Sequence, residues 1–400
     1  MTGSGLQPAG RQRLPRAVWV LGLVSLFMDM SSELVHAILP VYLTTVLGLS
    51  VLAVGIIEGI AEATASMLKV VSGFISDRFA RRKPLALLGY GLAALTKPIF
   101  PLADSAFGVV SARFVDRVGK GIRGAPRDAL VADVTPPGLR DAAFGLRQSL
   151  DTVGAFFGPL LAILFLWLWA NDLRAVLWVA VVPATIAVAL LAFGLDEPAP
   201  QRSLQAQRLQ FSALRRMPLA YWRLIGLTAL IAAARLSEAF LVLRAQETSL
   251  PLLWIPLVLI VMSAVYAASS YPAGLLAARF GRSGLLGGSL VALVAAELSL
   301  ALLPGHPGLW IGVALWGLHM GLSQGGLSAA VADVAPAELR ATAFGVFHFV
   351  TGVFQLAGCV LAGWLWMHQG SALAFLFGSA FGVGAWILLV MQPRDRLAGS

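Results

Sequence analysis

The chain has 400 residues, of which 58% are hydrophobic and only 12% are charged, and its mean hydropathy is +0.82. A soluble globular core cannot bury so large an apolar fraction, so these values exclude an ordinary soluble domain and indicate a membrane protein. The formal net charge of +9 would also suit a nucleic-acid-binding protein, so the location of the basic residues decides between the two.

Apolar segments long enough to cross a bilayer, about 20 residues each, recur along the whole chain. We predict an all-α integral membrane protein with twelve transmembrane helices. The predicted spans are Ala17–Leu47, Val51–Ile75, Leu85–Leu102, Phe107–Val131, Ala142–Ala170, Val176–Leu195, Trp222–Leu243, Leu252–Ala277, Leu285–Leu303, Leu309–Val334, Ala343–Met367 and Leu373–Met391.

The basic residues outside these spans concentrate on one side of the membrane. That side holds Arg11, Arg13, Arg16, Arg78, Arg81, Arg82, Lys83, Arg140, Arg202, Arg208, Arg215, Arg216, Arg279, Arg282, Arg340, Arg394 and Arg396. The other side holds little beyond Arg174 and Arg244. The positive-inside rule therefore places both termini in the cytoplasm and predicts a multi-pass protein of the bacterial inner membrane. This asymmetry accounts for the basic charge, so we expect no nucleic acid partner.

The chain divides into two similar halves at a polar segment. Ala132-Asp-Val-Thr-Pro recurs as Ala332-Asp-Val-Ala-Pro, and Ala143-Phe-Gly recurs as Ala343-Phe-Gly with the same separation. Parallel repeats of six spans are typical of one class of transporter. The predicted domains are a cytoplasmic tail over 1–16, a six-helix bundle over 17–195, a cytoplasmic linker over 196–221, a second six-helix bundle over 222–391 and a cytoplasmic tail over 392–400.

The polar loop after the second span carries a family resemblance. Gly73-Phe-Ile-Ser-Asp-Arg-Phe-Ala-Arg-Arg resembles the Gly-x-x-x-Asp-Arg-x-Gly-Arg-Arg loop of the major facilitator superfamily, with Ala80 in place of the second glycine. Arg117-x-x-Lys120-Gly121 resembles the signature of that family's fourth helix.

The fifth span adds a second part to this resemblance. Gly145, Gly154, Gly158 and Pro159 match the spacing of the fifth-helix signature, which in this superfamily is typical of exporting antiporters. The resemblance covers essentially the whole chain. It implies two pseudo-symmetric six-helix bundles and the proton-coupled drug and metabolite antiporter branch.

Acidic residues lie inside the first two spans, where a central charge costs roughly 2.5 to 3.5 kcal/mol on insertion scales. Asp29, Glu33 and His36 share one helix face in the first span, and Glu58 and Glu62 share a face in the second. We expect the four carboxylates to be candidates for proton coupling, and His36 to be structural. The alternative is that they only form ion pairs inside the bundle with Lys69 or Lys97.

The fourth span carries a strip of cations, Arg113, Arg117 and Lys120, at helical spacing. We expect this strip to line the substrate cavity, where it can attract an anionic solute or interact with the carboxylates. Lys97 precedes Pro98 near the outer end of the third span. We expect its ammonium group to reach the membrane surface, and the alternative is that a helix break at this point turns the charge inward.

Two further groups of residues complete the predicted site. Candidates for contact with the solute in the second half are Glu238, His319, Gln324, His348 and Gln355. Candidates for gating are Asp77, Arg78, Arg82, Gly154, Gly158 and Pro159. The resemblance implies that Asp77 faces Arg117 and a helix terminus and so holds one transport state.

These features predict a secondary active transporter that works by alternating access, with proton-coupled export of a small organic compound or drug as the preferred mechanism. The alternatives are proton-coupled uptake of a small anionic solute or metal chelate, and a transporter-like membrane receptor. No Walker loop, HExxH motif or His/Cys cluster is present, and Cys359 is the only cysteine. We therefore expect no enzymatic activity, no cofactor and no metal site, and partners limited to a small-molecule substrate, protons and the lipid bilayer around a monomer.

Overall fold

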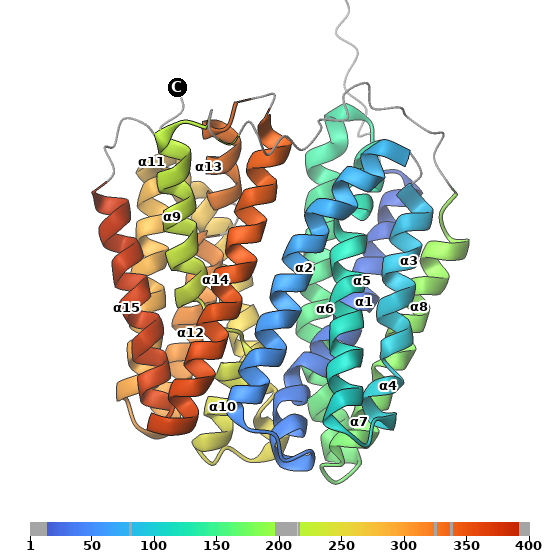
Figure 1. Ribbon diagram of the computed structural model, residues 1–400. Helices are drawn as coiled ribbons and strands as arrows, with labels where there is room; N and C mark the ends of the chain where they lie inside the picture. Colours follow the sequence, from blue (N-terminus) through green and yellow to red (C-terminus); the bar gives the residue numbers. More distant parts are fainter. Residues whose placement is uncertain are drawn as a thin grey trace, which may run out of the picture.

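The computed structural model describes residues 14–79, 82–196, 214, 217–323, 326–336 and 339–391, and these residues form helices and short connections without a strand (Figure 1). The α-helices are α1 (Arg16–Val41), α2 (Val51–Phe79), α3 (Arg82–Thr96), α4 (Ile99–Leu102), α5 (Ala106–Asp133), α6 (Arg140–Leu168), α7 (Leu173–Val179), α8 (Val181–Phe193), α9 (Leu219–Ala234), α10 (Ala239–Glu247), α11 (Leu257–Leu302), α12 (Gly305–Ser323), α13 (Gly326–Val334), α14 (Arg340–Gln369) and α15 (Ser371–Val390). Short π or 3-10 helices are η1 (Tyr42–Val46), η2 (Pro137–Leu139) and η4 (Leu252–Trp254).

Ten segments of the described chain are helical, long and apolar enough to cross a membrane. The two predicted spans outside this set are 107–131 and 309–334. The first is formed by α5, whose charged residues lower its hydropathy, and the second is divided between α12 and α13. A helix satisfies every backbone hydrogen bond internally, which is why lipid-spanning segments of this composition take that form.

The helices form two bundles (Figure 1). Helices α1 to α8 make the first bundle, in which α1 packs against α6 and α8, and α5 packs against α2 and α3. Helices α9 to α15 make the second, in which α11 packs against α12 and α15, and α9 packs against α14. The predicted all-α, two-bundle architecture is confirmed. The predicted domain limits stay a prediction, because the tails and most of the linker lie outside the described residues.

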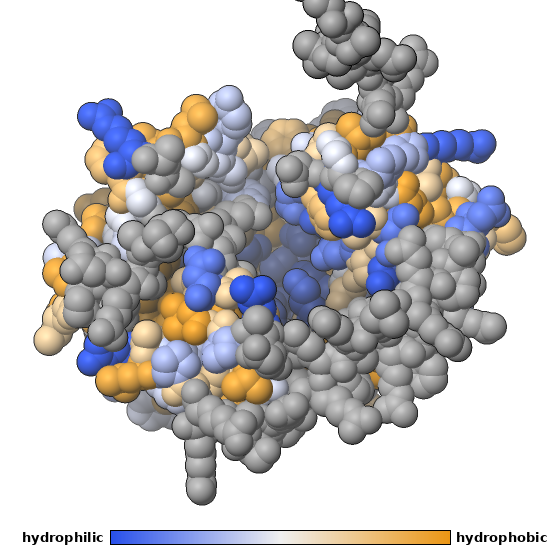
Figure 2. All heavy atoms as spheres, turned by 90° about the horizontal axis from the view of Figure 1, so that it is seen from above, coloured by the Kyte–Doolittle hydropathy of each residue, from blue (hydrophilic) through white to orange (hydrophobic). Residues whose placement is uncertain are grey.

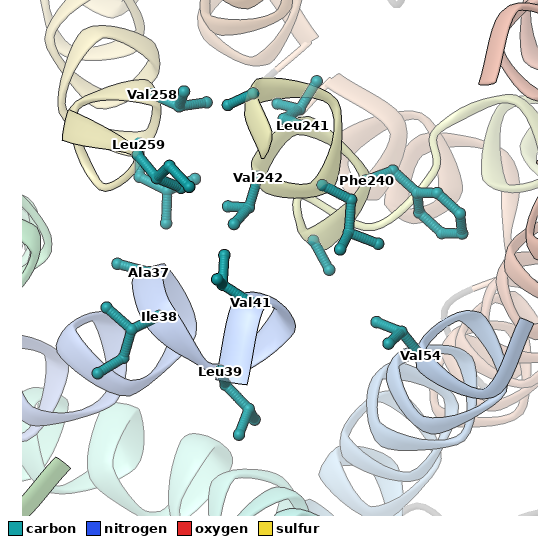
Figure 3. Close-up of a cluster of buried hydrophobic side chains, with 14 of the residues drawn as sticks. Ala37, Ile38, Leu39, Val41, Val54, Phe240, Leu241, Val242, Val258 and Leu259 are labelled. Carbon is teal, nitrogen blue, oxygen red and sulfur yellow. The ribbon is translucent and has the colours of Figure 1, made fainter. Parts of the chain in front are cut away.

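The bundles meet tightly at the end of the molecule where α10 lies, which we call the closed end. Figure 3 shows Val41 of α1 facing Val242 of α10 within a buried apolar cluster. Beside it, α2 packs on α14 through glycines: a Cβ added to Gly59 would lie 3.1 Å from the Cα of Leu356, and one added to Gly363 would lie 3.0 Å from the Cα of Leu52. The closed end is therefore held by apolar and backbone contacts.

A hollow separates the bundles at the opposite end, which we call the open end. Viewed from that end, the molecule has a central depression with hydrophilic residues at its floor (Figure 2). A cavity of about 620 Å³ lies there between α6, α11 and α12, with Gln148, Thr152, Tyr266 and Ser270 among its lining residues. The structure thus has one closed and one open end, as expected for one state of an alternating-access protein.

Several predicted spans are interrupted in the structure. The span predicted as Trp222–Leu243 breaks between α9 and α10, where Arg235 has an extended ψ of 90°. Gly281, with φ 70°, divides α11 into two spans, because glycine adopts this left-handed region without steric cost. A discontinuous helix near the middle of the membrane frees backbone groups and places polar side chains in the interior.

Helix α6 approaches α1 closely through Gly154 and Gly158. A Cβ added to Gly158 would lie 2.6 Å from the carbonyl oxygen of Met30 and 2.8 Å from the backbone nitrogen of Leu34. One added to Gly154 would contact the carbonyl oxygen of Leu26. These two glycines therefore set the spacing of two helices inside the first bundle.

Replacing Gly158 with Leu should destabilise the purified protein by about 1 to 3 kcal/mol, because the new side chain must displace the backbone of α1. Gly91→Leu is the matched control, since a Cβ on Gly91 meets nothing within 4 Å and both positions are helical. Thermal unfolding in detergent, followed by tryptophan fluorescence, measures both. Equal melting temperatures for the two variants would contradict the tight α1–α6 contact.

Candidate functional site

Helix α5 lies at the centre of the first bundle because glycines let it approach both neighbours. A Cβ on Gly119 would lie 2.6 Å from the carbonyl oxygen of Gly89 in α3, and one on Gly121 would lie 2.6 Å from the Cβ of Leu68 in α2. This close packing buries Arg113 and Arg117, which are 1% and 3% exposed. Two members of the predicted cationic strip are thus held in the interior, where each cation needs a partner.

Arg113 binds the carboxylate of Glu58 on α2. Its Nε donates to Oε1 at 3.0 Å and its Nη2 donates to Oε2 at 2.7 Å, and both side chains are 1% exposed. A guanidinium matches a carboxylate in this two-bond arrangement better than any other cation. Glu58 also accepts a longer hydrogen bond, 3.5 Å, from the hydroxyl of Ser237 in the second bundle.

Two more pairs surround this one. Arg117 lies 3.2 Å from the carboxylate of Glu62, whose side chain is 27% exposed. The ammonium of Lys97 donates to Oδ1 of Asp116 at 2.8 Å, and Lys97 is 1% exposed. The expectation that Lys97 reaches the membrane surface is wrong: the helix break before Pro98 turns its side chain inward, where the Asp116 carboxylate neutralises it.

His36 joins the two bundles. Its Nδ1 lies 3.5 Å from Oε2 of Glu33 on α1 and 3.8 Å from Oε2 of Glu238 at the start of α10. Its Nε2 lies 3.9 Å from Oε2 of Glu58. The break between α9 and α10 is what brings Glu238 to this position. Glu33 of the first bundle and Glu238 of the second therefore meet around one imidazole.

Another group of charges lies nearer the open end. Asp29 is 3.7 Å from Arg123 on α5 and also lies against Asp151 on α6. Arg127 is 3.8 Å from Asp151, and Arg147 is 3.6 Å from it. Three helices of the first bundle are thus linked by ion pairs on the side that faces the hollow.

Two cations near the site have no ion pair among the described residues. Lys120 on α5 is exposed, in contrast to Arg113 and Arg117 on the same strip. Arg235, at the break after α9, is also exposed and lines a second cavity of about 330 Å³. Both are available to an anionic group that enters from the open end.

The second cavity contains some of the predicted solute-contact residues. His319 and Gln355 line it together with Thr228 and Arg235. The Nδ1 of His319 lies 2.9 Å from the carbonyl oxygen of Ser289. His348 is instead stacked on Phe344, with ring centroids 6.4 Å apart. Gln324 lies outside the described residues.

The described gating candidates lie on α3 and α6, outside the two cavities. The side chains of Asp77 and Arg78 lie outside the described residues. Arg82 forms a 2.6 Å ion pair with Asp133 and donates to the carbonyl oxygen of Ala129, which ties α3 to the end of α5. Gly154 and Gly158 contact α1, and Pro159 lies inside α6. The gating role of these residues stays a prediction.

Sequence reasoning missed the residues that line the larger cavity from the second bundle. Tyr266 borders both cavities, and Ser270 lies one turn further along α11. The available signal was the polar and small side chains at helical spacing in the eighth span, including Ala273 and Gly274.

Comparison with known proteins identifies the family to which this architecture belongs. The sequence model of the Major Facilitator Superfamily matches residues 21–261 and 241–399, which together span nearly the whole chain. The chain belongs to the Major Facilitator Superfamily. It is therefore a multi-pass membrane protein, and its family is one of transporters and not of enzymes.

Relatives and solved structures agree with this assignment. A protein of Methanocaldococcus jannaschii named an uncharacterized MFS-type transporter is 31% identical over 385 residues, covering 95% of each chain. Among solved structures, a D-xylose-proton symporter has a TM-score of 0.74 at 15% identity, with 96% of this chain and 98% of that chain covered. The human organic anion transporter MFSD10 has a TM-score of 0.65 at 20% identity, with 96% and 100% covered. These structures support the fold alone.

The buried pair of Arg113 and Glu58 should be essential for stability in this superfamily member. Arg113→Gln leaves the Glu58 carboxylate buried with no guanidinium, so a loss of about 3 to 5 kcal/mol is expected. The double variant Glu58→Gln/Arg113→Gln should recover part of this loss. Unfolding in detergent micelles measures the wild type, Arg113→Gln, Glu58→Gln and the double variant.

The exposed pair of Arg174 and Asp104 provides the control. Their side chains are 44% and 84% exposed, so Asp104→Asn should change stability by less than about 1 kcal/mol. A double variant as unstable as the sum of its single variants would show that the two side chains of the buried pair do not interact.

Proposed function

We propose that the chain is a secondary active transporter that exports a small organic compound or drug in exchange for protons. The observation that supports this proposal is the arrangement of charge around the hollow. Carboxylates of α1 and α2 face bases of α5, and Glu33, Glu62 and Asp29 are the partly exposed members, with side chains 23%, 27% and 24% exposed. Partly exposed carboxylates beside buried bases can exchange protons with water in the hollow.

The His36 junction supplies a route for coupling. Glu33 and His36 belong to the first bundle, whereas Glu238 belongs to the second. When the bundles rock, Glu238 moves away from His36, and the proton affinity of Glu33 and His36 changes with the conformation. A difference in proton affinity between two states is what allows a proton gradient to drive the change.

The proposed orientation follows the basic residues. We propose that the open end faces the cytoplasm of a bacterial cell and that both tails lie there, since Arg82 and Arg140, the first residues of α3 and α6, lie at this end (Figure 1). Each chain contains its own hollow, the ion pairs around Glu58 and Arg113, and the group of charges around Asp29 and Asp151. This supports a monomer as the functional unit. The tight α1–α6 contact through Gly154 and Gly158 would keep the first bundle rigid during rocking.

Export is also supported by one group of relatives. The multidrug resistance protein MdtH of Photorhabdus laumondii is 30% identical over 144 residues, which is 36% of this chain. A match over about a third of the chain makes drug-like solutes the first compounds to test.

A second candidate function is proton-coupled uptake of a small anionic solute. Arg235 and Lys120 favour it, because both are exposed without an ion pair among the described residues. A carboxylate or phosphate group would find the cavity next to Arg235 electrostatically favourable.

The test of the proposed export function begins with a thermal-shift screen of the purified protein against drugs, siderophores and organic acids. The compound that stabilises it most is then used in proteoliposomes with an imposed proton gradient. Uptake into vesicles with an acidic interior supports antiport, and uptake from an acidic exterior supports symport. Saturable binding with no flux would instead identify a receptor.

In the same vesicles, Glu33→Gln should abolish gradient-driven flux while solute exchange continues, because the variant cannot release a proton at this position. Thr152→Ala is a control in the larger cavity that removes no titratable group. Full coupled transport by Glu33→Gln would remove Glu33 from the proton pathway.

Arg235→Gln separates the two candidate functions. If the solute is an anion, this variant should weaken its binding by about tenfold to a hundredfold, since a charge-assisted hydrogen bond contributes roughly 1.5 to 3 kcal/mol. Binding of a cationic or neutral drug should change little. Isothermal titration of the stabilising compound measures the difference, and unchanged affinity for an anionic compound would contradict the role of Arg235.

A further inference from the structure

The junction between the bundles contains three groups at metal-ligand spacing. One carboxylate oxygen of Glu33, one ring nitrogen of His36 and one carboxylate oxygen of Glu238 all lie within 4.8 Å of one another. A tetrahedron with metal-ligand bonds of about 2.1 Å has edges of about 3.4 Å. The distances from Nδ1 of His36 to Glu33 and Glu238, 3.5 and 3.8 Å, are close to that edge.

The imidazole of His36 is buried, and its two ring nitrogens face different carboxylates. The residue is 7% exposed, and its Nε2 has no partner in the described structure. The nearest carboxylate oxygen on that side, Oε2 of Glu58, is 3.9 Å away, beyond hydrogen-bond distance. With its proton on Nε2, on the side of Glu58, the imidazole would present the lone pair of Nδ1 to Glu33 and Glu238, which is the orientation in which a histidine ligates a metal ion.

Charge balance gives a third reason. Glu58 is neutralised by Arg113, and Glu62 by Arg117. The ion pairs of Glu33 and Glu238 among the described residues are with His36 alone. Lys120 and Arg235 act on these carboxylates from further away and form no ion pair with them. Two carboxylates without a fixed cation match the charge of a divalent metal ion.

We propose that a first-row transition-metal dication such as Zn²⁺ or Mn²⁺ binds to Glu33, His36 and Glu238. One imidazole with two carboxylates suits these ions, whereas Mg²⁺ and Ca²⁺ prefer oxygen ligands alone. The side chains of Glu33 and Glu238 are each 23% exposed, which leaves space for water as a further ligand. Because the ligands come from both bundles, the bound ion stabilises the closed end.

This proposal does not depend on the transported solute or on proton coupling. Its first test is metal binding by the full chain, purified in detergent and stripped with EDTA. Isothermal titration with Zn²⁺ and electron paramagnetic resonance with Mn²⁺ should each detect one site per chain, and Mg²⁺ should not compete. Failure to bind either metal ion would overturn the proposal and leave the transport function untouched.

Variants identify the ligands. His36→Gln and Glu238→Gln should each weaken Zn²⁺ binding by at least about tenfold. His348→Gln is the matched control, because His348 is another histidine inside the membrane region and stacks on Phe344 away from these carboxylates. Equal affinity in His36→Gln and the wild type would overturn the site. If His36→Gln does not fold, Glu33→Gln gives the same test.

The native cysteine reports the effect on the closed end. Cys359 is buried on α14, and a Cβ on Gly55 of α2 would lie 2.5 Å from its carbonyl oxygen. Cys359 is 0% exposed within the apolar cluster of the closed end, so maleimide can reach its thiol only when this cluster opens. Mn²⁺ should slow this labelling several-fold in the wild type and leave it unchanged in Glu238→Gln. An equal rate with and without Mn²⁺ in the wild type would overturn the proposed stabilisation of the closed end.

Discussion

The structure depends on the neutralisation of buried charge. Helix α5 carries arginines through the centre of a bundle that lies in lipid, where an unpaired cation is very unfavourable. Glu58 and Arg113 satisfy each other with two hydrogen bonds, and Lys97 with Asp116 does the same beside them. Removing one member of such a pair leaves a charge with neither water nor partner, so α2, α5 and the C-terminal end of α3, which contribute to these pairs, must fold together.

The two bundles use different interactions. In the first, ion pairs tie α1, α2, α5 and α6 together around one side of the hollow. In the second, the cavity is lined mainly by neutral polar side chains such as His319, Gln355 and Thr228, with Arg235 as its cation. A charged face opposite a neutral, adaptable face suits a protein in which one bundle senses protons and the other contacts much of the solute.

Sequence reasoning recovered the elements that depend on periodicity and composition. Twelve spans, two repeated halves and the helix faces of Glu58, Glu62, Arg113 and Arg117 follow from spacing along single helices. The ion-pair partner of each charged residue could not be predicted from spacing along one helix, because it depends on how far the helices are shifted and rotated against one another. The sequence allowed Asp116 to pair with Lys120 one turn away, whereas the structure pairs it with Lys97 from another helix.

Helix breaks were the second feature that the sequence-based prediction missed. The segment around Arg235 is apolar on both sides, so hydropathy predicted one continuous span there, and no glycine or proline marks the interruption. His36 was expected to be structural, and its own helix gave no sign that Glu238 lies beside it. Its position between Glu33 and Glu238 is produced by that unexpected break, which hydropathy along one helix could not reveal.

The His36 junction is where the ionic network of the first bundle reaches the second bundle. Elsewhere at the closed end, α2 and α14 meet through glycine and backbone, and α1 and α10 meet through apolar side chains. Those contacts change little with pH or with a bound ion, so they fix the geometry of closure without regulating it. On the functions proposed above, the balance between closed and open states responds at Glu33, His36 and Glu238, where a proton or a metal ion would change the charge that the two bundles share.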